Sequence, residues 1–124
     1  MVLKEAAYFE RFNVNTTAKV LADPAKRKLL INMVKQVQKV SAELRKSPKP
    51  FLPAISKAIA TPEPIITKIW PNFRFPAGMD QAKLRAVLET MEPWAASLTP
   101  ARSQRSKETL AGLVDGSVLS ESRA

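Results

Sequence analysis

Four lysines are the residues best placed to do chemistry in this chain, and that chemistry is the neutralisation of negative charge. Over residues 24–46 the apolar residues recur every three or four positions, which is the period of an amphipathic α-helix. At about 100° per residue the lysines fall together on the opposite side, and at about 1.5 Å per residue they form a row roughly 27 Å long. Such a row attracts phosphates or carboxylates. The predicted anion-binding residues are this lysine stripe (Lys28, Lys35, Lys39 and Lys46) with two flanking arginines, Arg27 and Arg45.

The helix that carries the stripe has clear signals at its start and one apolar side. Asp23 suits the N-cap because its carboxylate accepts hydrogen bonds from the first free N–H groups, and Pro24 suits the first helical position, where no N–H is needed. We expect the apolar side to pack against the helix predicted near 80–91 or against a helix of a partner. That side, called here the apolar seam, consists of Leu30, Met33, Val37, Val40 and Leu44.

Seven of the ten prolines lie within residues 47–76. They predict extended chain over 47–53 and again over 70–76, because proline fixes its own φ and restricts the residue before it. Periodicity cannot distinguish helix from strand over 65–70, although the proline-containing cap signal before this run favours helix. Clustered aromatic residues stack nucleobases or anchor in a protein partner, and the single nearby cation favours the protein. The predicted docking residues of this segment are Trp70, Phe73 and Phe75.

The sequence as a whole predicts an all-α fold with extended proline-rich segments. Asp80 provides an N-cap for a second helix, and Pro93 is expected to end that helix. We expect a single small helical domain or extended subunit over 1–116, with a proline-rich middle over 47–76, and a polar tail over 117–124. The predicted helices cover about 24–46 and about 81–91, with weaker ones near 2–12, 53–60, 62–70 and 100–114.

The net charge of +9 comes entirely from the middle of the chain. Residues 24–76 contain eleven Lys or Arg and two acids, whereas the remainder contains nine residues of each sign. This concentration indicates an anionic partner for that region: an acidic protein surface, RNA or anionic lipid head groups. The alternative is that the lysines only keep the protein soluble.

The composition argues against an enzyme and against a metal or cofactor. The chain has no histidine and no cysteine, so it lacks the commonest general base and the commonest transition-metal ligands. Its acids are dispersed and its three glycines form no glycine-rich loop, which leaves no carboxylate pair for acid–base catalysis and no phosphate cradle. We therefore expect a binding protein with no catalytic residue, no cofactor and no metal.

The sequence predicts neither a membrane span nor a secretory signal. No window approaches the roughly 18 to 20 apolar residues needed to cross a bilayer, and the N-terminus lacks a cationic start followed by an apolar stretch. The acids Glu5 and Glu10 argue against a standard mitochondrial presequence. We expect an intracellular protein and favour a mitochondrial assembly, reached without a cleaved presequence.

Two resemblances bear on function. The string from Val20 to Leu30 is similar to a helix opening of ArsR-like winged-helix repressors. The turn, recognition helix and wing that would follow are absent, so we interpret this match as shared capping chemistry rather than DNA binding. In its general style, the chain resembles small accessory subunits of mitochondrial respiratory complexes and of ribosomes.

Three binding hypotheses remain. The first, which we predict, is a non-catalytic structural or accessory subunit of a large multiprotein assembly, because an extended proline-rich middle buries little on its own. The second is RNA binding of a ribosomal type through the basic residues 24–49. The third is attachment to an anionic membrane face. It is disfavoured because the lysines point directly away from the apolar seam instead of flanking it.

Overall fold

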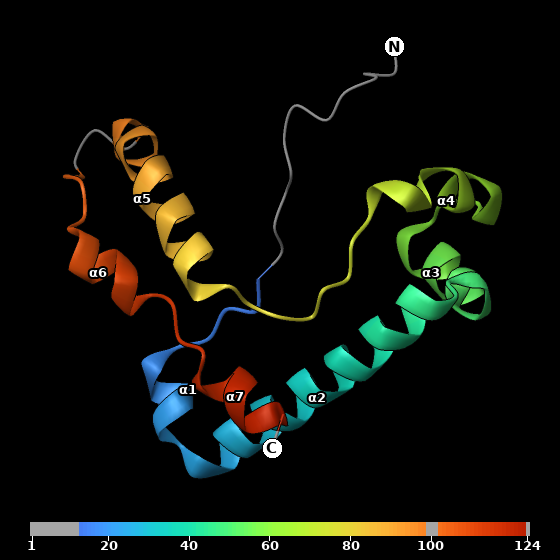
Figure 1. The fold of residues 1–124 in the computed structure, drawn as a ribbon, viewed down its shortest axis with the longest axis horizontal. Coiled ribbons are helices and arrows are strands. Elements are labelled where there is room, and N and C mark those ends of the chain that lie inside the picture. Colours follow the sequence, from blue (N-terminus) through green and yellow to red (C-terminus); the bar gives the residue numbers. More distant parts are fainter. Residues whose placement is uncertain (1–12, 99–101, 124) are drawn as a thin grey trace.

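The longest helix of the protein is α2 (Pro24–Lys46), seen in a computed structural model that describes residues 13–98 and 102–123. The Asp23 carboxylate accepts hydrogen bonds from the backbone N–H groups of Ala25 and Lys26, at 3.0 and 3.1 Å. Pro24 occupies the first helical position, as a residue without an N–H can do at no cost. At 1.5 Å per residue the helix is about 35 Å long, and it forms one side of the molecule (Figure 1).

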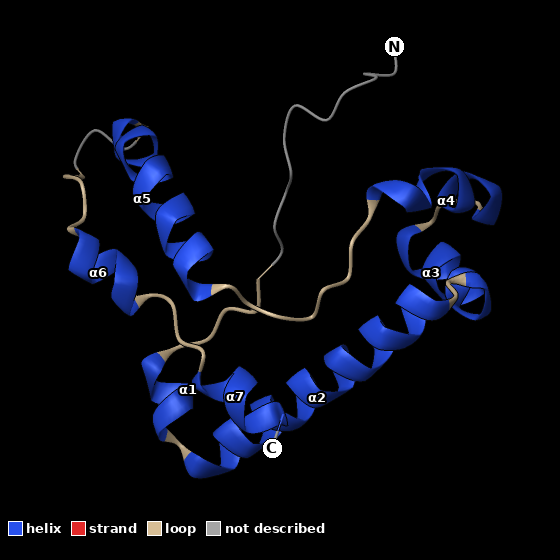
Figure 2. Cartoon of the chain, viewed as in Figure 1, coloured by secondary structure: helices blue, strands red, loops and turns tan. Residues whose placement is uncertain are grey.

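The other described elements are also helical, which confirms the predicted all-α class (Figure 2). No strand occurs within residues 13–98 and 102–123, and the 65–70 run, which periodicity left open, is helical up to Ile69. Among the described residues, one short helix precedes α2, four short elements follow it, and three helices come after them. These elements are α1 (Ala18–Ala22), η1 (Lys49–Phe51), α3 (Leu52–Ile59), α4 (Glu63–Ile69), η2 (Trp70–Asn72), α5 (Gln81–Ser97), α6 (Lys107–Gly112) and α7 (Ser117–Arg123).

The buried residues gather in three places instead of one core. At the C-terminal end of α2, helices α3 and α4 pack together around Leu52 and Ile66, the latter only 2% exposed. Toward the other end of α2, α7 lies along it with Val118 buried. Helix α6 packs against α5, where Leu110 and Ala96 are buried, and the segment 73–80 leads to α5 without helix (Figure 1). None of these groups covers the length of α2.

The chain exposes much more surface than a compact protein of its size. Its accessible surface is 10,097 Å², whereas a compact monomer of 13.7 kDa exposes about 6,600 Å². Even if the residues outside the described ranges are assigned the full area of an unfolded chain, about 2,500 Å², about 7,600 Å² remains for the described residues. A compact chain of their mass alone would expose about 6,000 Å², so the excess is about 1,600 Å². Within the described ranges, twelve large apolar residues are exposed while six apolar residues are buried. The isolated fold therefore leaves substantial apolar surface in water.

Helix α5 does not stop before Pro93, which corrects the prediction that this proline ends it. Pro93 lies inside the helix, which continues to Ser97. A proline has no N–H for the carbonyl four residues earlier, so its cost must be offset by other contacts. Those contacts are tertiary: Ala96 is buried, and the Glu92 carboxylate accepts a hydrogen bond from the backbone N–H of Arg105 at 2.8 Å.

The proline-rich middle is less extended than predicted. Residues 49–51 form a turn of 3-10 helix instead of extended chain, and so do residues 70–72. Each contains a proline in its first turn, a position that needs no N–H. The N-cap of α4 is Pro62, and the hydroxyl of Thr61 just before it donates to the carbonyl of Ile59 at 3.1 Å.

The C-terminal third differs most from the sequence prediction. In place of one weak helix over 100–114, the described part of that stretch is non-helical to the N-cap Ser106 and helical over α6. The segment 117–124 was expected to be a polar tail, yet residues 117–123 form α7, with Val118 buried. Packing against α2 stabilises this helix, which the sequence of the segment alone does not predict. The helix predicted near 2–12 lies outside the described residues.

Candidate partner-binding surface

One side of α2 is covered by other parts of the chain, and two arginines, Arg27 and Arg45, lie on that side. Arg27 and Arg45 are eighteen residues apart, which is five full turns, so they point in the same direction. Arg27 contacts α7, and Arg45 donates a hydrogen bond to the carbonyl of Phe75 in the segment 73–80. Residues that share this side are buried or half-buried, among them Ser41 and Val34. This covered face lies between the apolar seam and the lysine stripe, about 100° from each.

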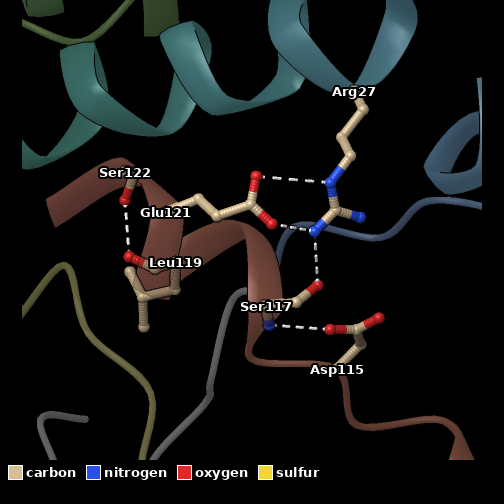
Figure 3. Close-up of polar contacts among 6 residues, drawn as sticks. All are labelled: Arg27, Asp115, Ser117, Leu119, Glu121 and Ser122. Atoms are coloured by element: carbon tan, nitrogen blue, oxygen red, sulfur yellow. Dashed lines mark hydrogen bonds and ion pairs between the residues drawn. The ribbon is translucent and has the colours of Figure 1, made fainter. Parts of the chain in front are cut away.

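Arg27 joins α2 to α7 through three polar contacts (Figure 3). Its guanidinium donates to both carboxylate oxygens of Glu121 and, at 2.9 Å, to the hydroxyl of Ser117. The hydrogen bond from Arg27 lowers the pKa of Glu121 below its ordinary value of 4.5. Asp115 accepts a hydrogen bond at 2.7 Å from the backbone N–H of Ser117, the first residue of α7. Hydrogen bonds from Ser117 lower the pKa of this aspartate too.

The two arginines were predicted to join the lysines in holding an anion, and the structure places them elsewhere. Arg27 is already paired with Glu121, and Arg45 is engaged by a backbone carbonyl. Both point to the covered face instead of the side that carries the lysines. The sequence contained no signal for this assignment, since the acid that neutralises Arg27 is 94 residues away along the chain.

The apolar seam is uncovered along its middle. Met33 is 44% exposed, Val37 44% and Val40 43%, while Leu30 and Leu44 at the two ends are half-buried. The expected packing against the 80–91 helix is not present, because the helices with substantial contact to α2 in the described chain are α1 and α7. Within one chain, the apolar seam therefore faces outward.

The lysine stripe is also exposed. All four lysines lie on the surface, within about 40° of one another around the helix axis. Lys46 pairs with Glu43 at 3.0 Å on its own helix, and Lys28, Lys35 and Lys39 make no ion pair within the described ranges. The stripe and the apolar seam thus lie on opposite sides of one straight helix.

The aromatic residues predicted to dock in a neighbour form a small cluster of their own. The rings of Trp70 and Phe75 stack with centroids 5.1 Å apart, and those of Trp70 and Phe73 meet at a tilt, 6.2 Å apart. Phe73 remains 50% exposed. The cluster therefore presents one half-exposed aromatic ring, that of Phe73, which contacts Trp70.

A second exposed apolar surface, on α5, was not predicted. Met91 and Trp94 lie on one side of that helix, Leu98 is its C-cap, and the three are 40%, 61% and 62% exposed. Their helical spacing was a usable signal, but it crosses Pro93, where the helix was expected to end. A large exposed tryptophan with apolar neighbours is typical of protein interfaces.

The remaining polar residues form structural contacts. Glu92, though buried, pairs with Arg102 and accepts the backbone N–H of Arg105, which hold the pKa of its carboxyl below the ordinary range. An open hollow beside the start of α5 is lined by Gln81, Arg85 and Asp115 among others. In the part of the chain that the structure describes, no group of three or more acids is arranged to hold a metal ion. Over those same ranges, no helix has the length and apolar character needed to cross a membrane.

Comparison with protein-family models, with curated proteins and with solved structures found no match to this chain.

Proposed function

We propose that this protein is a non-catalytic structural or accessory subunit of a large multiprotein assembly. The single observation that carries the proposal is the apolar seam of α2, whose middle residues Met33, Val37 and Val40 remain 43–44% exposed in the described chain. A helix of this kind is normally stabilised by packing of its apolar side. We propose that a helix or groove of another subunit supplies this packing.

The energetic argument supports a protein partner of ordinary size. Full burial of a valine or methionine side chain contributes about 1.5 to 3 kcal/mol, so covering three half-exposed ones adds roughly 3 kcal/mol in total. The excess surface of the described chain, about 1,600 Å², is about twice what one partner contributes to a standard interface. Surface on that scale accommodates more than one contact, and the Phe73 cluster and the α5 surface around Trp94 supply candidates for the others.

The alternative function, RNA binding through residues 24–49, draws its support from the exposure of the lysine stripe. Lysines along one side of a helix neutralise phosphates without reading sequence. However, Arg27 and Arg45 are engaged within the chain, and the aromatic rings that would stack bases lie in another segment. A protein partner is therefore the function we favour, and an intracellular, mitochondrial assembly is the first that we propose to examine.

The experiment is fractionation of a native lysate that contains the tagged full chain, by size and after organelle separation, with and without ribonuclease. The proposal expects the chain in a large particle with a fixed set of proteins, unchanged by ribonuclease. Ribonuclease-dependent migration would support the RNA alternative instead, and migration as a single chain at its own mass would contradict both.

A further inference from the structure

Opposite the apolar seam, the lysine stripe forms a second docking surface on α2, and its geometry restricts what can bind there. We propose that its ligand is an acidic α-helix of a partner protein, laid lengthwise along α2 with carboxylates spaced to meet the four lysines. This inference rests on the proposed function, since it names the partner chemistry for one face of the same helix.

The spacing of the four lysines along α2 fits the spacing of side chains on a second helix. The lysines are separated by seven, four and seven residues, so along the axis their spacings are about 10, 6 and 10 Å. A second helix with glutamates seven, four and seven residues apart presents the same spacings on one side. Because the series reads the same in both directions, either orientation of the partner helix matches it. Two straight rods also stay in contact over the whole row, roughly 27 Å.

The density of the cations also favours a protein partner. Arginine forms bidentate contacts with carboxylates and phosphates alike, whereas lysine binds either one as a point charge, so the spacing of the lysines is what distinguishes the two. The two arginines of α2 are turned to the covered face and engaged there, so the outward face carries lysine alone. Duplex DNA also carries about one charge per 1.7 Å of its axis, and an A-form RNA helix is similarly dense in phosphates. The stripe has one positive charge per roughly 9 Å of axis, which is far less than the charge density of such a polymer. It is comparable to the density of carboxylates along one side of an acidic helix.

The apolar seam and the lysine stripe can each bind a different partner at the same time. They lie on opposite sides of α2, and α7 takes the side between them. A partner on the apolar seam therefore does not obstruct the lysines. Under the proposal, α2 bridges two neighbours, one held by apolar burial and the other by charge.

The test uses the full chain and labelled probes in fluorescence anisotropy. The main probe is a helical peptide with four glutamates in the seven, four, seven spacing, and its control has the same composition with the glutamates spread around the helix. An oligouridine and anionic phospholipid vesicles provide the other two sources of negative charge. We expect the registered peptide to bind about tenfold more tightly than its control, with affinity falling as salt rises.

Variants then locate the binding on the chain. K28Q/K35Q/K39Q should weaken binding of the registered peptide about tenfold, whereas K19Q/K57Q/K68Q, which has the same net charge and alters exposed lysines elsewhere, should change it less than about threefold. Equal binding of the two peptides, equal losses in the two variants, or tighter binding of oligouridine or vesicles would each overturn the inference. If the inference fails while the chain still enters a protein assembly, the proposed function stands without it. If the peptide binds but no assembly is found, the proposed function fails alone.

Discussion

The covered face of α2 and its two uncovered sides use different residues for different purposes. The covered face carries arginines, and these hold the chain together by contacts to Glu121 and to the carbonyl of Phe75. The uncovered sides carry either apolar residues or lysines, and the middle of the apolar seam and all four lysines are exposed. Within the chain, α2 is therefore stabilised along one side, and under the proposed function its two other sides meet partners.

The largest expected effect on stability comes from a charge on the covered face. Val34→Asp places a carboxylate at a half-buried position on the side that packs against the rest of the chain. Burying a charge without a partner should lower the free energy of unfolding by about 2 to 3 kcal/mol. Thermal unfolding followed by circular dichroism measures this loss. An unchanged melting temperature would show that this side of α2 is not covered after all.

A smaller effect is expected from the contact between α2 and α7. Glu121→Gln removes the carboxylate that Arg27 contacts. Both side chains are partly exposed, so the loss of stability at neutral pH should be clearly smaller than for Val34→Asp. Arg27→Gln should have a similar effect, and combining the two should add little, since each already breaks the same contact. A strictly additive double variant would contradict the pairing.

The same contact predicts how stability depends on pH. Because the folded pKa of Glu121 is lowered, the unfolded chain binds its proton more readily. The contribution is therefore fully present above the ordinary value of 4.5 and is lost as the pH falls through the lower, folded value. Glu121→Gln should reduce the loss of stability between neutral pH and pH ~3. Unfolding measured across that range in both proteins checks the sign.

On the lysine side, substitution should leave stability almost unchanged. K28Q/K35Q/K39Q alters three exposed lysines that pair with no acid in the described residues, so the free energy of unfolding should change by no more than about 0.5 kcal/mol. Helicity should be retained while binding to the acidic partner is weakened. If the triple variant unfolds, the lysines support the fold and the separation between the sides of α2 is wrong.

Signals that act over a few residues made part of this structure predictable. Asp23 and Pro24 at the start of α2, the three- and four-residue spacing along it, and Asp80 at the start of α5 are of this kind. Each depends on hydrogen bonds or burial within one helix. The all-helical class follows from these signals, and the exposure of the four lysines agrees with their placement opposite the apolar seam.

Features that depend on distant residues were not predictable. Pro93 remains within α5 because Arg105 and the buried Ala96 stabilise the turns around it. The segment 117–123 is helical in contact with α2, although its own composition suggests a tail. For the same reason, periodicity identified an apolar side of α2 but not which side the chain itself covers. The partners of Arg27 and Arg45 were not predictable either, because they lie 94 and 30 residues away along the chain.

The most direct test of the account compares Val37→Asp with Val34→Asp in the full chain. The two variants make the same chemical change three residues apart on one helix, and valine and aspartate have similar helix propensity. We would measure the helicity and stability of each purified protein by circular dichroism, and its entry into the large particle by fractionation of native lysate. We expect Val37→Asp to keep its helicity and its stability to within about 0.5 kcal/mol but to be absent from the large particle. A Val37→Asp chain that unfolds, or one that assembles as the unaltered chain does, would contradict the claim that the apolar seam is a docking surface.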